Sequence, residues 1–147
     1  MEQKSRSELR KKIMTILYQI NMYKKNKIDF NVDSVIKEVE EIDNEFIKDT
    51  VYGVLTYEKE IDNLANKYLD GWKIDRLGNT DKAILEMAIY ELLYTNTPNI
   101  VCINEAIELA KLYSDDSVRK MINGVLDKIL HQQEENEWKI FNNNSFN

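Results

Sequence analysis

The residues that could do chemistry in this sequence suit a binding surface better than a catalytic centre. Four scattered glycines cannot form a glycine-rich phosphate loop, and the lone histidine, His131, has no evident nucleophile partner. With Cys102 as the single cysteine, an ordinary Cys/His metal site is excluded. The adjacent acids Glu40–Glu41 and Asp115–Asp116 stand in polar stretches, where solubilising charges are the simpler interpretation. We therefore expect no enzyme, no cofactor and no metal site.

Groups suited to recognition are concentrated near the N-terminus. Arg6, Arg10 and Lys11 can pair with phosphates, and Tyr18 offers a ring on which an unpaired base can stack. Residues 1–27 hold eight basic residues against two acidic ones, whereas the whole chain has a net charge of −6, so the remainder carries −12. Such a chain can attract a polyanion at one end. Two plainer interpretations stay open: an ordinary solvated helix face, and a Tyr18 ring packed against another helix.

A helix over about residues 5–23 must position these groups. Ser5 and Glu8 have the spacing of a capping box, which satisfies free amide groups at a helix start. A stripe of apolar residues then recurs at helical spacing, at Leu9, Ile13, Ile16, Leu17 and Ile20. We expect this stripe to face the core.

The same helical geometry places the charged groups. Because successive residues turn by about 100°, Arg6 and Arg10 lie one above the other at the edge of the apolar stripe. Lys4, Lys11 and Tyr18 fall on roughly the opposite side, so basic groups and an aromatic ring share exposed surface.

Apolar residues recur at helical spacing through the rest of the chain, which predicts an all-α fold class. The expected helices cover about residues 32–42, 44–69, 81–95, from 100 or 104 to 113, and 117–131. Gly53 predicts close helix packing, since glycine costs roughly 1 kcal/mol against alanine inside a helix. Thr80 is the expected N-cap of the helix 81–95, whose wide apolar face predicts a central position.

The end of the chain differs from the rest. The segment QQEENEWKIFNNNSFN is acidic and asparagine-rich, and its aromatic residues Trp138, Phe141 and Phe146 follow no long period. We expect one helical domain over residues 1–131 and a polar C-terminal tail over residues 132–147, a frayed helix that becomes mobile.

The environment of the chain can also be predicted. No stretch approaches the roughly 20 apolar residues of a membrane span, and the N-terminus lacks the apolar core of a signal peptide. We expect a cytoplasmic protein without membrane contact, in which Cys102 is a small core residue.

Four segments, in this order, resemble the NusB family. They are RSELRKKIMTILYQ (6–19), FIKDTVYGVL (46–55) followed by Ile61-Asp62 and Trp72, DKAILEMAIYELLY (81–94), and Pro98 with INEAIELAKLY (103–113) and INGVLDKI (122–129). The resemblance covers nearly everything before about residue 131. It implies a compact all-α fold of two small helical lobes with about six to seven helices.

The resemblance also implies a function in transcription antitermination. Members of the family bind the boxA element of ribosomal RNA leader transcripts together with the ribosomal protein NusE, and they help RNA polymerase resist termination. Two rivals stay open. One is a related RNA-binding module, like the module that is fused to ribosomal RNA methyltransferases. A chain of 147 residues leaves no room for the methyltransferase domain, so a stand-alone factor is favoured. The other is a protein–protein adaptor or homodimer without RNA binding, and possible self-association belongs to the family as well.

Carried over by position, Arg6 and Arg10 match the family's arginine-rich start and are expected to contact RNA phosphates. Ser7 stands where many members have another basic residue, which shifts phosphate contact toward Lys11 and Lys12.

Further positions match elsewhere in the chain. Tyr18 and Asp81 match positions near the RNA and partner surface. Lys120 and Met121 match a Lys-Phe pair ahead of an N-G-V-L-D motif, where the aromatic ring would touch a base; methionine can cover a base but stacks less well. The expected RNA-binding set is Lys4, Arg6, Arg10, Lys11, Tyr18, Lys120 and Met121, and the expected partner-binding set is Tyr18 and Asp81.

Overall fold

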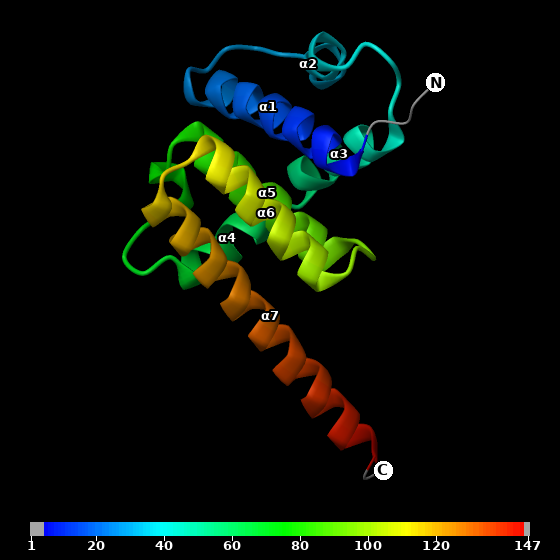
Figure 1. Ribbon diagram of the computed structural model, residues 1–147, viewed down its shortest axis with the longest axis vertical. Coiled ribbons are helices and arrows are strands. Elements are labelled where there is room, and N and C mark those ends of the chain that lie inside the picture. The colour runs from blue at the N-terminus through cyan, green and yellow to red at the C-terminus, as the bar shows by residue number, and fades with distance from the viewer. Residues whose placement is uncertain (1–4, 146–147) are drawn as a thin grey trace.

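Helices account for most of residues 5–145, the part of the chain that this computed structural model describes (Figure 1). Its elements are α1 (Arg6–Lys25), α2 (Val32–Val39), α3 (Glu45–Thr56), α4 (Glu58–Tyr68), the short 3-10 helix η1 (Ile74–Arg76), α5 (Asn79–Tyr94), α6 (Asn99–Tyr113) and α7 (Asp116–Ser145). No strand occurs among the described residues, which confirms the all-α prediction. None of these helices combines the length and apolar character needed to cross a membrane.

Helix α5 lies at the centre, as its wide apolar face predicted. It packs against α1, α3, α4, α6 and α7. On one side, α2 and α3 pack on α1; on the other, α4, α6 and α7 gather around α5 (Figure 1). The two groups of helices correspond to the two expected lobes, and a single apolar cluster connects them.

The first helix follows its predicted pattern closely. Ser5 is the N-cap and accepts a hydrogen bond from the backbone N–H of Glu8, as the capping-box spacing predicted. The predicted stripe is buried throughout, from Leu9 to Ile20, and Cys102 is buried as well, with 2% of its surface exposed.

One long helix was expected over residues 44–69, but the chain bends at Tyr57 and forms α3 and α4. No glycine or proline marks this bend. The bend lets α3 pack against α1 while α4 packs against α7, so tertiary contacts decide it. The Tyr57 ring also stacks on Tyr94 of α5, with ring centres 4.1 Å apart.

The start of α5 also differs by two residues from the prediction. Gly78 is the N-cap, and it has no side chain that could form a cap hydrogen bond. Thr80 lies inside the first turn of the helix. Asp81, in the same turn, instead accepts a hydrogen bond from the Ser114 hydroxyl at the end of α6. Asp81 thereby joins the start of α5 to the turn that precedes α7.

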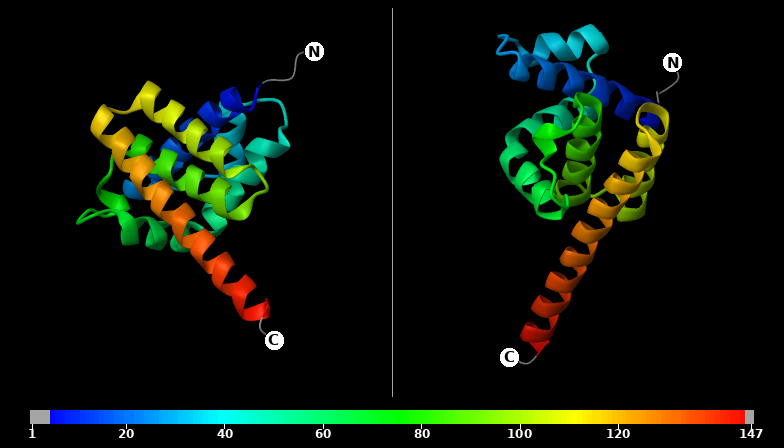
Figure 2. Two further views of the ribbon diagram at one scale, coloured as in Figure 1. Left: turned by 60° about the horizontal axis from the view of Figure 1, so that its bottom comes forward. Right: turned by 90° about the vertical axis from the view of Figure 1, so that its left-hand side faces the viewer.

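The last helix continues past the expected end at residue 131 and reaches Ser145, projecting from the helical body (Figure 2). The Tyr68 hydroxyl on α4 donates a hydrogen bond to the Gln132 side chain at 2.7 Å, which joins this part of α7 to the helical body. Beyond it, Trp138 and Phe141 expose 66% and 69% of their surface. Phe146 lies outside the described residues.

We predict that ending the chain after Glu135 leaves its stability almost unchanged, because the exposed residues beyond it bury little surface. Thermal unfolding should shift by less than about 4 °C, corresponding to under roughly 1 kcal/mol. As a contrast, ending the chain after Asp127 removes the buried Ile129 and the Tyr68–Gln132 bond, and should unfold the protein at a much lower temperature. Equal losses from both truncations would show that the projecting segment belongs to the core.

Candidate nucleic-acid interface

The first turn of α1 presents Arg6 to solvent. The Ser5 hydroxyl accepts from the Glu8 N–H at 3.2 Å, which fixes this turn. The guanidinium of Arg6 lies 4.5 Å from the centre of the Phe46 ring on α3, within reach of cation–π attraction. The ring orients the side chain while Arg6 stays exposed. Arg6 is therefore a cation that a phosphate can approach.

Arg10 is not the exposed neighbour of Arg6 that helical geometry suggested, because only 3% of its surface is exposed. Its guanidinium donates to both carboxylate oxygens of Glu91 on α5, at 2.9 and 2.5 Å. Burial by itself would lower the pKa of Arg10, but the hydrogen bonds and charge of Glu91, with the charge of Glu105, raise it. Arg10 is therefore buried rather than exposed at the rim, and its guanidinium is bonded to carboxylates.

A second carboxylate joins α6 to the same place. Glu105 accepts a hydrogen bond from the Ser7 hydroxyl at 2.8 Å and lies 3.7 Å from the Arg10 guanidinium. Arg10 therefore connects α1 to α5 and α6 at once. Removing one partner of a buried ion pair costs about 3–5 kcal/mol, so this contact strongly constrains how α1 is turned about its own axis.

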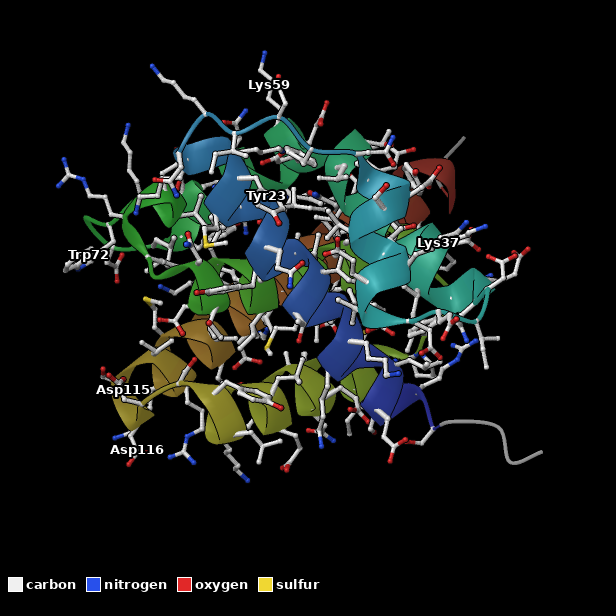
Figure 3. The ribbon with its side chains drawn as sticks, turned by 90° about the horizontal axis from the view of Figure 1, so that it is seen from above. Tyr23, Lys37, Lys59, Trp72, Asp115 and Asp116 are labelled. Atoms are coloured by element: carbon white, nitrogen blue, oxygen red, sulfur yellow. The ribbon has the colours of Figure 1, made fainter. Side chains whose placement is uncertain are left out.

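This rotation directs Lys11 and Tyr18 outward. Seven residues are nearly two helical turns, so the two side chains share one side of α1. Both are exposed, and Tyr18 has 37% of its surface open to solvent, so part of its ring is accessible while the rest is covered. In Figure 3, α1 crosses this face of the molecule between α2 and α6. Lys12 points elsewhere and pairs with Glu40 of the α2 end at 2.7 Å.

The remaining predicted residues lie on other elements. Lys120 is exposed near the start of α7, while Met121 is half-buried and packs against the core. Asp81 is half-buried at the start of α5. Among the described residues, no recorded hydrogen bond, ion pair or ring contact joins these three side chains to α1. Lys4 lies outside the described residues.

Sequence reasoning missed the residues that hold the site together. Phe46 was expected only as part of the helix over residues 44–69, yet its ring supports Arg6. Glu91 and Glu105 were not singled out, because their partners lie far away in the sequence. A signal did exist, since Glu86 and Glu91 interrupt the otherwise apolar face of the 81–94 segment. Buried acids of this kind require a partner.

Glu86 belongs to a second buried polar cluster, where α4 meets α5. Carboxylate oxygens of Glu58, Asp62 and Glu86 lie within 4.8 Å of one another. Burial, and then the hydrogen bond to and charge of Asp62, raise the pKa of Glu86 to about 9. Burial also raises the pKa of Asp62. At neutral pH the geometry therefore favours one shared proton between Glu86 and Asp62.

Cations at the edge of this cluster balance its remaining charge. Lys24 of α1 pairs with Glu58 at 2.5 Å, and the charge of Lys82 lowers the pKa of both Asp62 and Glu86. Lys24 and the shared proton thus offset two of the three carboxyl groups, and Lys82, which also pairs with Asp75 at 2.9 Å, reduces the remaining negative charge. The side-chain amide of Asn21 on α1 donates a hydrogen bond to Glu86 at 3.4 Å, so this cluster also helps to hold α1 against α5.

Comparison with known proteins identifies what this helical arrangement resembles. The model of the NusB family matches residues 7–131. The transcription antitermination protein NusB of Halalkalibacterium halodurans is 43% identical over 115 residues, which are 78% of this chain and 84% of the relative. NusB of Bacillus subtilis is 39% identical over 127 residues, covering 84% of this chain and 93% of the relative.

Solved structures show the same similarity. T. maritima NusB superposes with a TM-score of 0.74 at 30% identity, covering 87% of this chain and 92% of that one. A chain in a crystal structure of the antitermination factors NusB and NusE with double-stranded RNA has a TM-score of 0.71 at 28% identity, covering 84% of this chain and 94% of that one.

The raised pKa of Glu86 predicts how stability depends on pH. Below pH 4.5, the ordinary value for glutamate, Glu86 is protonated in both folded and unfolded chains. Between pH 4.5 and about 9 the native protein retains the proton that the unfolded chain loses, so the free energy of unfolding falls as pH rises. The contribution of this group has a slope of up to about 1.4 kcal/mol per pH unit.

Denaturant unfolding of the wild type and Glu86→Gln from pH 5 to 9 measures this effect. The uncharged amide should remove the slope, so that the variant gains stability relative to wild type as pH rises. The matched control is Glu38→Gln, at an exposed carboxyl group on α2, and its curve should run parallel to the wild type. A Glu86→Gln curve that also ran parallel would rule out a proton held at this carboxyl group.

Proposed function

The chain belongs to the NusB family, and we propose that it acts in transcription antitermination by binding boxA-type RNA along the exposed side of α1. The observation that carries this proposal is the exposure of Lys11 and Tyr18 on one side of α1, a helix whose rotation is fixed by a buried ion pair. Arg6 adds an exposed cation on another side of the first turn of the same helix. Cations pair with phosphates and a ring accepts a base, so the surface offers both contacts that single-stranded RNA needs.

Two further positions extend the proposed RNA surface. Lys120 offers an exposed cation near the start of α7. The half-buried Met121 can cover a base edge, with weaker stacking than an aromatic ring would provide. We propose that Arg10 serves the RNA indirectly by positioning Arg6 and Lys11, and that Lys4 adds to the positive charge ahead of α1.

The proposed protein partner is NusE, and the proposed wider assembly is the RNA polymerase antitermination complex. A relative of similar structure forms a complex with NusE and double-stranded RNA, which supports a shared RNA and protein surface. We place the NusE contact at Tyr18 and Asp81. Residues 1–131 would suffice for these interactions, since the family match ends at residue 131, and residues 132–147 would be dispensable for them. We propose that the protein works in the cytoplasm by binding rather than by catalysis.

RNA titrations at several salt concentrations test the proposed surface. Arg6→Ala with Lys11→Ala should weaken binding to a boxA-type RNA and flatten the plot of log affinity against log salt by roughly 1.4, since each phosphate contact on a single strand contributes about 0.7. Tyr18→Ala should cost roughly 1–3 kcal/mol of binding free energy with little change in slope, because stacking releases no counterions.

The control is Lys59→Ala with Lys67→Ala, which removes the same charge from exposed positions on α4. This variant should retain most of the wild-type affinity and its salt slope. If the Arg6 and Lys11 variant bound RNA like the wild type, the RNA site would lie elsewhere, and the adaptor or homodimer without RNA binding would become the better account.

A further inference from the structure

Three tyrosines form a row at the end of α5 that the RNA surface does not use. The rings of Tyr57 and Tyr94 are stacked with centres 4.1 Å apart and planes inclined by 9°. Tyr94 also stacks on Tyr90, with centres 5.7 Å apart and planes inclined by 19°. Tyr57 and Tyr94 each expose 39% of their surface. We call these three residues the tyrosine row.

Close packing holds the inner end of the tyrosine row in place. A Cβ atom at Gly53 on α3 would lie 2.2 Å from the Tyr90 ring, so this ring occupies the space that only glycine leaves free. The prediction of close packing at Gly53 is thereby confirmed. A ring fixed in this way loses little conformational freedom when a ligand binds, which favours affinity.

Two carboxylates act on the tyrosine row, one at each of Tyr90 and Tyr94. Burial first, and then the charge of Asp49, raise the pKa of Tyr90; burial and then the charge of Glu60 raise the pKa of Tyr94. Both carboxylates belong to exposed residues. The formal charges that act on these two hydroxyl groups are therefore negative.

A groove of about 760 Å³ adjoins the inner end of the row. Its wall includes the rings of Tyr90 and Phe46 and the charged residues Glu45, Asp49, Glu105, Arg6 and Arg10. Within this groove the Arg6 guanidinium already lies over an aromatic ring, at 4.5 Å from the centre of Phe46. The groove has three carboxylates against two arginines, and Arg10 is already paired with Glu91, so the lining stays acidic and can hold a further guanidinium beside the Tyr90 ring.

We propose that the tyrosine row and this groove dock a basic, arginine-bearing segment of a partner protein. A guanidinium can stack flat on a tyrosine ring and pair with Asp49, Glu45 or Glu60 at the same time. These carboxylates repel phosphates at the tyrosine row, while the wall of the groove that holds Arg6 adjoins the proposed RNA surface. A second copy of the chain is disfavoured by its net charge of −6.

The probe for this docking surface is the peptide acetyl-Arg-Gly-Arg-Gly-Arg-amide, titrated into the full chain and followed by calorimetry and by backbone amide NMR shifts. We expect saturable binding with shifts centred on Tyr57, Tyr90 and Tyr94. The matching lysine peptide should bind more weakly, because an ammonium group cannot stack as a plane. Each of Tyr57→Ala and Tyr94→Ala should weaken binding of the arginine peptide by about two- to fivefold.

Charge and position controls complete the experiment. Asp49→Asn with Glu60→Gln should weaken peptide binding and reduce its salt dependence. Tyr113→Ala, which removes an exposed ring from the end of α6, should leave peptide affinity unchanged. Neither tyrosine-row variant should alter RNA binding, so failure here is distinguishable from failure of the proposed RNA surface. The proposal is overturned by equal binding of the arginine and lysine peptides, by unchanged affinity in the tyrosine-row variants, or by binding of a uridine oligonucleotide that these variants abolish.

Discussion

The architecture of the binding surface depends on the buried ion pair between Arg10 and Glu91. A guanidinium and a carboxylate both lose water on burial, and only bidentate hydrogen bonding with good geometry compensates for that loss. Burying either charge without its partner would strongly destabilise the fold. The pair therefore fixes how α1 is rotated about its own axis where it packs on α5. That rotation sends the apolar stripe inward and leaves Arg6, Lys11 and Tyr18 outside.

The charges of the molecule are divided according to the same principle. Arg10 pairs with the buried Glu91, whereas Glu86 and Asp62 share a proton and Lys24 pairs with the neighbouring Glu58. Arg6 and Lys11 remain exposed on α1, while the net charge of the whole chain is −6. An acidic protein can in this way present a basic helix to RNA while offering a different, negative surface at the tyrosine row.

The helices could be predicted from the sequence because they depend on local rules. Apolar spacing and the Ser5 cap define α1 within two residues, and the resemblance of residues 6–129 to one family was confirmed. Contacts between distant residues could not be predicted in this way. Arg10 and Glu91 are 81 positions apart, and the bend at Tyr57 depends on which helices α3 and α4 contact. Helical geometry placed Arg10 at the edge of the apolar stripe of α1. Whether a side chain at that edge is buried depends on its partner on α5, which the spacing within α1 cannot reveal.

A double-mutant cycle on Arg10→Ala and Glu91→Ala, with unfolding free energy and the salt dependence of RNA binding measured for each protein, tests the central claim most directly. Each single change should destabilise the protein by about 3–5 kcal/mol, and the double change should cost clearly less than their sum. Under conditions where the variants remain folded, the salt slope should match the wild type, because Arg10 contacts no phosphate. Unchanged stability in Arg10→Ala, combined with a slope flattened by roughly 0.7, would instead place Arg10 on the RNA and contradict the account.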